Sequence, residues 1–407
     1  MDANATTPLL PEVFDAMRPF WIEQFGNASS IHQQGQHARA AVEQAREQVA
    51  ALLHCRASEI VFTSGGTESD NLALFGVLQP YLVSKEPAHL ITSAIEHHAV
   101  LHAAQALGDR GIEVTFLPCT RGGLIEPAAL EAAMRPHTKL VSIMLANNET
   151  GVVQPIAELA AIAHAHGALF HSDAIQAAGK LPLDLSPASS KTPGAFAQVD
   201  LLSISGHKMY APQGTGVLFC RRSVRLSPLF FGGSHERQRR PGTENVAGIV
   251  ALGKAAELAQ RWLAETGAEA GPQELSALRD HLEQGILAQL DEAGVNGREL
   301  PRVANTTNLF FDHVEAEALV IALDLKGLAV SGGSACQSGA TEPSHVLTAM
   351  GLSPARARAS IRLSLSRLTT PEDIDYALAI LPAAVARLRT LSPTWRKPDP
   401  ALAGLSS

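Results

Sequence analysis

Cysteine is scarce in this sequence: four residues in 407, Cys55, Cys119, Cys220 and Cys336. They are far apart and form no CxxC pair, which excludes a disulfide framework and gives no sign of a zinc or thiol-redox site. A cysteine with a function in this chain therefore acts alone, through the reactivity of its own thiol.

Long apolar runs are also missing. No stretch approaches the roughly 18 to 20 apolar residues that a membrane-spanning helix needs. The first residues, Met1 to Asn4, lack the basic and apolar regions of a secretory signal peptide. We therefore expect a soluble protein of the cytoplasm.

Positive charge is in deficit, since 32 Lys and Arg against 40 Asp and Glu give a net charge of −8. The basic residues are scattered, apart from a short run at Arg237 to Arg240. This pattern predicts binding neither to nucleic acid nor to an anionic membrane. With 46% apolar and 18% charged residues the chain is typical of a folded globular protein, and its length indicates two compact units or one large domain with an appendage.

Short apolar runs alternate with Ala-rich helical stretches from about residue 46 to residue 220, as is typical of a parallel sheet with crossover helices. The predicted strands are Ile60–Thr63, His89–Ser93, Glu113–Leu117, Leu140–Ala146, Ala168–Ser172, Leu201–Ser205 and Gly216–Cys220. The predicted helices between them are Glu96–Leu107, Pro127–Met134 and Pro155–His166. The Ser- and Pro-rich residues 186–198 are expected to form a surface loop.

A second, α+β unit is predicted after a Gly- and Glu-rich break at residues 267–272, which follows a long helix that ends at about Ala264. The predicted elements of this unit are the helices Leu275–Glu292, Glu315–Leu325 and Pro371–Thr390 and the strands Asn308–Phe311 and Ser360–Leu365. The Pro-, Ser- and Ala-rich tail from Pro393 is expected to be frayed.

Two glycines, Gly65 and Gly66, join a predicted strand to a helix that opens with Thr67. Backbone N–H groups and the helix dipole at such a junction attract a phosphate. Taken alone, the same pattern is more often a simple turn before a helix. It therefore gains weight only from the other groups that converge on it.

Asp173 and Lys208 each follow a predicted strand. The carboxyl ends of parallel strands are where open α/β sheets bind ligands, although Asp173 alone would serve equally as a helix N-cap. An isolated lysine is ordinarily a solvated charge. Lys208 lies between Gly206 and the apolar residues 211–218, and a desolvated lysine has a lowered pKa and becomes nucleophilic.

These groups together fit pyridoxal phosphate, which needs a phosphate cradle, an acid beside the pyridine nitrogen and a lysine that forms a Schiff base. The segment Glu96-His97-His98 adds a ring to stack on the pyridine. Adjacent histidines would also serve as cap and surface residues, or as a metal pair. The metal alternative is the weaker one, because no acid or histidine stands at a suitable helical spacing on the same element.

From Asp2 to about Arg387 the sequence resembles the class V aminotransferase family of pyridoxal phosphate enzymes and, within it, the cysteine desulfurases of the NifS/IscS type. The matching motifs are DANATTP (2–8), FGN (25–27), TSGGTESDN (63–71), EHHAV (96–100), NNETG (147–151), HSDAIQ (171–176), SGHK (205–208), GGSHERQRRPGTEN (232–245), SGGSACQSG (331–339), EPSHVL (342–347) and SIRLSL (360–365).

The resemblance implies roles around the cofactor. Lys208 would bind pyridoxal phosphate as a Schiff base, and Asp173 would pair with the pyridine nitrogen. Gln176 would bond the phenolic oxygen, and His97 would stack on the ring.

The phosphate would be held by Gly66, Thr67, Ser205 and His207, and by Thr243 of the neighbouring subunit of a homodimer. No metal is implied.

The resemblance also implies a substrate site. Asn148 and Arg362 would bind the substrate carboxylate, which matches the planar guanidinium fork. Cys336 lies in a run of small residues with three glycines, which favours neither helix nor strand. On such a loop its thiolate would attack the substrate sulfur and then carry the sulfur as a persulfide to an acceptor outside the pocket. His97 would exchange protons at the sulfur atoms.

The fold that the resemblance implies is the α/β fold of pyridoxal phosphate-dependent transferases (fold type I). It has a large domain with a mainly parallel seven-stranded sheet and a smaller α+β C-terminal domain. We divide the chain into an N-terminal segment that packs with the small domain (residues 1–14), a large cofactor-binding domain (15–265), a small domain that carries the Cys336 loop (266–392) and a tail (393–407).

The implied activity is that of a cysteine desulfurase, which converts L-cysteine to L-alanine and passes the sulfur to a protein acceptor such as an iron–sulfur scaffold, or to another thiolation pathway. Three alternatives compete with it. A class V aminotransferase would not need Cys336, and a selenocysteine lyase would use the same groups. A sulfur-carrying or scaffold subunit without turnover would not need Lys208, Asp173, His97 and Cys336 together.

Overall fold

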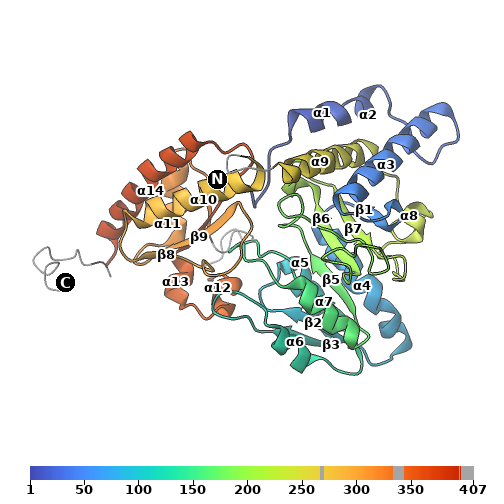
Figure 1. Ribbon diagram of the computed structural model, residues 1–407, viewed down its shortest axis with the longest axis horizontal. Coiled ribbons are helices and arrows are strands. Elements are labelled where there is room, and N and C mark those ends of the chain that lie inside the picture. The colour runs from blue at the N-terminus through green and yellow to red at the C-terminus, as the bar shows by residue number, and fades with distance from the viewer. Residues whose placement is uncertain (266–269, 333–342, 394, 396–407) are drawn as a thin grey trace, which may run out of the picture.

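The computed structural model describes residues 1–265, 270–332, 343–393 and 395 (Figure 1). Two β-sheets organise this part of the chain, one of seven strands and one of four. Figure 1 shows the smaller sheet with α10, α11 and α14 on one side of the molecule and the larger sheet with its helices on the other. No helix in the described ranges is long and apolar enough to cross a membrane.

The large sheet has the strand order β1-β7-β6-β5-β4-β2-β3. Its strands are β1 (Ile60–Thr63), β2 (His89–Ser93), β3 (Glu113–Leu117), β4 (Thr138–Ser142), β5 (Leu169–Asp173), β6 (Leu201–Ser205) and β7 (Gly216–Cys220). Strand β7 runs antiparallel to β1 and β6, and the other neighbours are parallel. The predicted, mainly parallel seven-stranded sheet is therefore confirmed.

Two strands differ from the prediction at both ends: β4 begins at Thr138 instead of Leu140, and β5 begins at Leu169 instead of Ala168. Strand β5 includes Asp173 as its last residue instead of ending at Ser172. Strand β4 ends at Ser142 and not at Ala146, because the chain leaves the sheet there and places Met144 and Ala146 against a cavity.

Helices cover both faces of the large sheet. They are α1 (Pro11–Met17), α2 (Pro19–Ile22), α3 (Gln33–Leu52), α4 (Gly66–Ser84), α5 (His98–Gly108), α6 (Pro127–Ala133), α7 (Ile156–Ala165), α8 (His235–Gln238) and α9 (Val246–Ala264). Small residues let α3 and α9 pack closely, since a Cβ on Gly253 would lie 2.6 Å from the Cα of Ala45. The expected start of α5 at Glu96 is wrong by two residues, because the His97 side chain caps this helix.

The small sheet is antiparallel, with the strand order β10-β11-β9-β8. Its strands are β8 (Ala293–Val295), β9 (Thr306–Phe311), β10 (Ser331–Gly332) and β11 (Ser360–Ser364). The helices beside it are α10 (Gly271–Leu287), α11 (Ala316–Asp324), α12 (His345–Ala349), α13 (Pro354–Arg358) and α14 (Pro371–Leu391). The sequence predicted β9 and β11 but not β8 or β10, and α10 ends five residues before the expected Glu292 to make room for β8.

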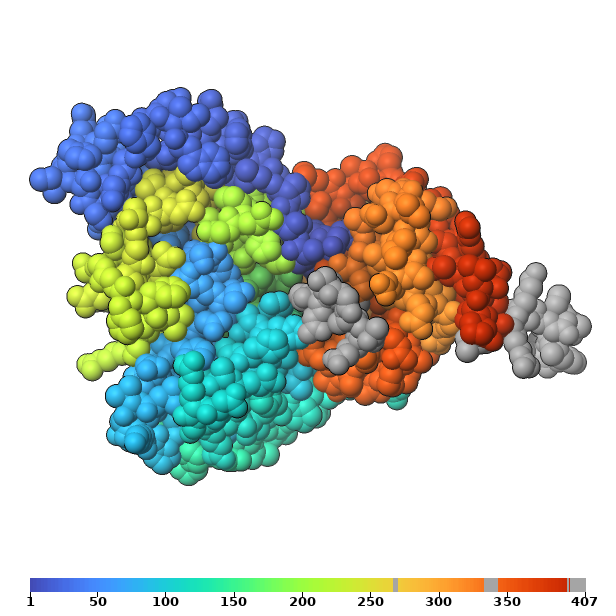
Figure 2. All heavy atoms as spheres, turned by 180° about the vertical axis from the view of Figure 1, so that it is seen from behind, coloured from blue at the N-terminus to red at the C-terminus, as the bar shows by residue number. Residues whose placement is uncertain are grey.

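The N-terminal segment connects the two sheets. Asp2 forms a parallel bridge with Ser364 of β11, whereas the backbone N–H of Thr7 donates to the carbonyl of His207, which follows β6. Figure 2 shows this segment in dark blue, in contact with both the green part of the large sheet and the orange and red small-sheet region. Side chains from both sheets therefore meet around residues 2–7.

Candidate active site

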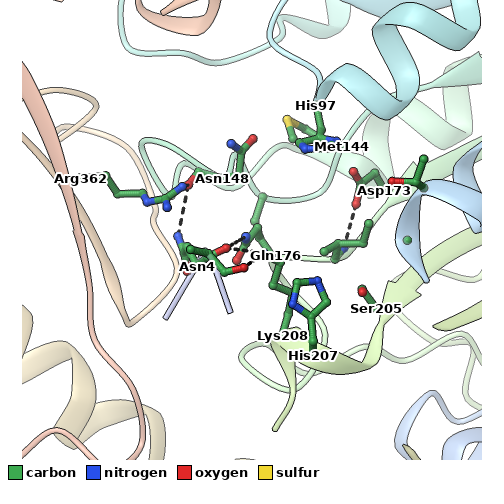
Figure 3. A pocket seen from close by; sticks show the side chains of 15 residues that line it. Asn4, His97, Met144, Asn148, Asp173, Gln176, Ser205, His207, Lys208 and Arg362 are labelled. Carbon is green, nitrogen blue, oxygen red and sulfur yellow. Dashed lines mark hydrogen bonds between the residues drawn. The ribbon is translucent and has the colours of Figure 1, made fainter. Parts of the chain in front are cut away.

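A cavity of about 320 Å³ opens where β5 and β6 end, between the large sheet, the N-terminal segment and β11 (Figure 3). This volume is in the range of small-molecule sites. Its lining residues are Asn4, Ala5, Gly66, Thr67, His97, Met144, Ala146, Asn148, Asp173, Ile175, Gln176, Ser205, His207, Lys208 and Arg362. Ten of the residues singled out in the sequence thus lie around one cavity.

Lys208 lies in the 3-10 turn Gly206–Lys208, directly after β6. Gly206 makes the turn possible, since a Cβ there would lie 2.2 Å from the Thr215 hydroxyl. The Lys208 amine donates to the backbone carbonyls of Asn4 at 2.5 Å and Ala5 at 2.7 Å. Its primary amine is therefore held at the cavity by the N-terminal segment.

Asp173 lies at the neighbouring strand end and is 3% exposed. Its Oδ1 accepts the backbone N–H of Ile175 at 2.8 Å. Asp173 therefore caps the backbone that follows β5 and also lines the cavity. Burial raises the pKa of this carboxyl to about 6, against the opposing effects of the Ile175 N–H and Lys208. A cationic partner at this carboxylate would restore its charge.

His97 faces the same space from the start of α5 (Figure 3). Its Nδ1 accepts the backbone N–H of Ala99 at 3.1 Å. Burial, followed by the nearby His98 and Lys208, lowers the pKa of His97 to about 4. The ring is therefore neutral near pH 7, with its proton on Nε2.

One end of the cavity is suited to an anion. Gly66 and Thr67 begin α4, whose first backbone N–H groups have no partner within the helix. A Cβ on Gly66 would lie 2.1 Å from Cδ1 of Ile175, so the backbone of Gly66 and the end of the Ile175 side chain lie close together here. Ser205 and His207 complete this end, and burial, followed by Lys208, lowers the pKa of His207 to about 4.

Arg362, from β11, reaches the cavity from the small sheet. Its two terminal nitrogens donate to the carbonyl of Asn148 at 3.0 Å and to the carboxylate of Asp2 at 2.9 Å. Within the described residues, Nε of Arg362 and Oδ1 of Asn148 are buried and have no hydrogen-bond partner. Such unpaired polar atoms are costly unless a ligand satisfies them.

Asn4 is a site residue that the sequence reasoning named only as part of a motif. Its side-chain amide donates to the Asn148 carbonyl at 3.2 Å and to Oγ1 of Thr306 at 2.8 Å. Its backbone carbonyl accepts the Gln176 amide at 3.1 Å. No local sequence signal marks this role, because every one of these partners is more than a hundred residues away.

Two predicted site residues remain, Thr243 and Cys336. Thr243 lines a separate cavity of about 560 Å³, together with Asn27, His235 and other polar residues. Cys336 lies outside the described residues. In the part of the chain that the structure describes, no group of three or more His, Cys, Asp or Glu side chains is arranged to hold a metal ion.

None of the three other cysteines lines the cavity. Burial raises the pKa of Cys55 to about 12 and that of Cys220 to about 11, and it also raises the pKa of Cys119. Near pH 7 all three are neutral thiols, which is the poorly nucleophilic form.

Comparisons with known proteins agree with this arrangement. The class-V aminotransferase family model matches residues 1–377. A cysteine desulfurase IscS of Dictyoglomus turgidum is 44% identical over 393 residues, 97% of this chain and 96% of that one. A cysteine desulfurase IscS of Anaeromyxobacter sp. is 50% identical over 398 residues, 97% of this chain and 94% of that one.

Solved structures give the same result. A NifS-like protein superposes with a TM-score of 0.85 at 34% identity, over 95% of this chain and 98% of that one. A structure described as SspA in complex with cysteine superposes with a TM-score of 0.77 at 36% identity, over 89% of this chain and 97% of that one. The chain therefore belongs to the class-V aminotransferase family and, within it, to the cysteine desulfurases.

Proposed function

We propose that this chain is a pyridoxal phosphate-dependent cysteine desulfurase that converts L-cysteine to L-alanine and takes up the sulfur on Cys336 as a persulfide. The observation that carries the proposal is the convergence of Lys208, Asp173 and His97 on one cavity, beside the N-terminus of α4. These are an amine, an acid and a neutral ring at an anion-binding helix end.

The donor set fits pyridoxal phosphate. The phosphate would lie against the first turn of α4, beside Gly66 and Thr67. Asp173 would hold the pyridine nitrogen protonated, and Gln176 would bond the phenolic oxygen. Lys208 would bind the cofactor covalently. When bound, the cofactor supplies an electron sink for the carbanion that forms at Cα of an amino acid.

Arg362 and Asn148 would bind the substrate carboxylate. The buried Nε of Arg362 and the carboxylate carry opposite charges, and their hydrogen bond would satisfy an atom that otherwise has no partner in the described structure. Lys208 would then take the proton from Cα of the substrate.

Sulfur transfer is assigned to Cys336 and His97. The Cys336 thiolate would attack Sγ of the substrate, so that an S–S bond forms while the Cβ–Sγ bond breaks and leaves its electron pair on Cβ. Protonation of the carbon skeleton then gives alanine. His97 would exchange protons at the sulfur atoms through Nε2, since its Nδ1 accepts the N–H of Ala99. The raised thiol pKa values of the other three cysteines support the choice of Cys336.

A homodimer would place Thr243 at the phosphate of the neighbouring subunit. Thr243 lines a cavity apart from its own chain's active site. Phe230 and Phe231, nearby in the same segment, are 51% and 93% exposed. Large exposed aromatic side chains are typical of an interaction surface. The sulfur acceptor would be a protein, such as an iron–sulfur scaffold in the cytoplasm.

Spectra and product assays of the purified protein test the proposal. We expect a visible cofactor absorbance that changes on addition of L-cysteine, together with alanine release that needs no keto acid. The Cys336→Ala variant should keep the absorbance and lose alanine release, whereas the control Cys119→Ala should keep both. Full turnover by Cys336→Ala would contradict the assignment, and so would an unchanged visible spectrum for Lys208→Ala.

A further inference from the structure

Lys180 is a buried lysine directly behind the active-site cavity. It is 8% exposed, and its Nζ donates to Oε1 of Gln176 at 2.6 Å and to Oδ1 of Asn4 at 3.2 Å. Lysine is almost never buried without a paired charge. None of the ion pairs among the described residues includes Lys180, and both of its acceptors are neutral amide oxygens.

The pKa of Lys180 is also unusual for a lysine. Burial lowers its pKa well below the ordinary value, and the positive charges of Lys208, Arg362 and Arg367 lower it further. A neutral amine still carries two N–H bonds. These are enough for its two acceptors, so the contacts of Lys180 do not depend on its charge.

The contact with Lys180 fixes the orientation of the Gln176 side-chain amide. Nε2 of Gln176 donates to the carbonyl of Asn4 at 3.1 Å, while its Oε1 accepts from Lys180. A flipped amide would set an oxygen against the Asn4 carbonyl, and that hydrogen bond would be lost. Its NH₂ group would then face the lysine amine, which could accept it only in the neutral form and with its one lone pair turned toward Gln176. The second N–H of Nε2 remains, on a side chain that lines the cavity.

We propose that Lys180 is a positioning residue, which holds Gln176 so that its amide N–H, and not its carbonyl, faces the phenolic oxygen of the cofactor. This inference rests on the proposed function, in which pyridoxal phosphate occupies the cavity. The phenolic oxygen is an acceptor when it is ionised. An N–H group stabilises it there, whereas a carbonyl oxygen would repel it.

Lys180 could instead serve only the stability of the fold, because it also donates to Asn4, and the side-chain amide of Asn4 donates to Thr306 of β9 in the small sheet. Oδ1 of Asn4, however, keeps a second donor in the amide of Asn305 at 3.0 Å. Oε1 of Gln176 has Lys180 as its one donor among the hydrogen bonds of the described residues. Removal of the Lys180 amine therefore leaves Oε1 of Gln176 without a donor among the described residues, whereas Oδ1 of Asn4 keeps one.

The test measures the dissociation constant of pyridoxal phosphate from the reconstituted protein, by equilibrium absorbance. Lys180→Met keeps the length and removes the donors, and it should weaken binding about tenfold, as expected for one lost hydrogen bond. In a Gln176→Ala background the same substitution should change binding less than twofold, because the effect passes through Gln176. The control Lys254→Met, at a lysine of α9 paired with Glu257, should bind as the parent does. An additive loss in the double variant overturns the proposal, as does unchanged binding by Lys180→Met.

A second variant keeps the test valid if Lys180→Met does not fold. Gln176→Glu retains, and strengthens, the contact with Lys180, but it presents only oxygen atoms to the cavity. It should bind pyridoxal phosphate at least tenfold more weakly and shift the visible absorbance of the bound cofactor. Binding by Gln176→Glu equal to that of the parent overturns the proposal. Failure of the parent protein to bind pyridoxal phosphate would instead refute the proposed function.

Discussion

Replacing Arg362 by lysine separates the geometry of the guanidinium from its charge. Arg362 uses its terminal nitrogens on Asn148 and Asp2, and its Nε is buried and unpaired in the described structure. A lysine keeps one positive charge but cannot hold both protein contacts and also donate to a carboxylate in one plane. We therefore expect Arg362→Lys to lose one charge-assisted hydrogen bond to the substrate.

A hydrogen bond to a charged group contributes about 1.5–3 kcal/mol, so the KM for L-cysteine should rise about 10- to 100-fold. The kcat should change little, because the carboxylate is bound equally in the ground state and in the transition state. The assay is alanine release at varied L-cysteine concentration. The dissociation constant of pyridoxal phosphate should stay the same, since the anion-binding end of the cavity is formed by other residues.

Two controls sharpen this experiment. Arg302 is also buried, at 6% side-chain exposure, and bonds both oxygens of Glu283, but it does not line the active-site cavity. Arg302→Lys should therefore leave KM unchanged. With the methyl ester of L-cysteine, which has no carboxylate, Arg362→Lys and the parent should react alike. An unchanged KM for Arg362→Lys, or the same loss with the ester, would refute the role of Arg362.

Three further predictions follow from single contacts. Gly66→Asp should release pyridoxal phosphate more readily on dialysis, because a carboxylate at the first turn of α4 would compete with the phosphate for this end of the cavity; equal retention would contradict the cradle. Burial raises the pKa of Glu96 to about 8, so this carboxyl destabilises the folded state increasingly as the pH rises from about 4.5 to 8. Glu96→Gln should therefore melt at a higher temperature than the parent at pH 8 and at the same temperature near pH 4; a difference that does not change with pH would contradict this. Glu236→Ala leaves the buried Arg46 without its bidentate partner and should lower the free energy of unfolding in urea by about 3 kcal/mol; a change below about 1 kcal/mol would show that the pair contributes little.

The large sheet could be predicted from the sequence because its strands are short apolar runs between turns. Five of the seven, among them Leu201–Ser205 and Gly216–Cys220, have the predicted bounds. Four of these five, all except the edge strand β3, are buried throughout, and burial on both faces leaves a continuous apolar run. Strands β8 and β10, with three and two residues, are too short to show any period. They are strands because β9 and β11 provide hydrogen-bond partners.

The residues of the site also fall into those that the sequence could predict and those that it could not. Asp173 and Lys208 could be predicted because each stands at the end of its own strand, so that local sequence and the rule for parallel sheets suffice. The roles of Asn4 and Lys180 could not, because the hydrogen bond between them joins positions 176 residues apart. A polar residue in a turn gives no sign of such a partner until the chain has folded.

Hydrogen bonds of the N-terminal segment link substrate binding to the positions of the two sheets relative to each other. Asp2 and the carbonyl of Asn148 hold the guanidinium of Arg362, and the same carbonyl accepts the side-chain amide of Asn4. The backbone carbonyl of Asn4 in turn accepts the amine of Lys208. A carboxylate bound by Arg362 therefore adds to hydrogen bonds that already join β11 to the end of β6. Because a ligand stabilises the arrangement that binds it, an amino acid in this cavity would favour the arrangement of the two sheets in which its carboxylate meets Arg362 and its Cα meets the amine of Lys208.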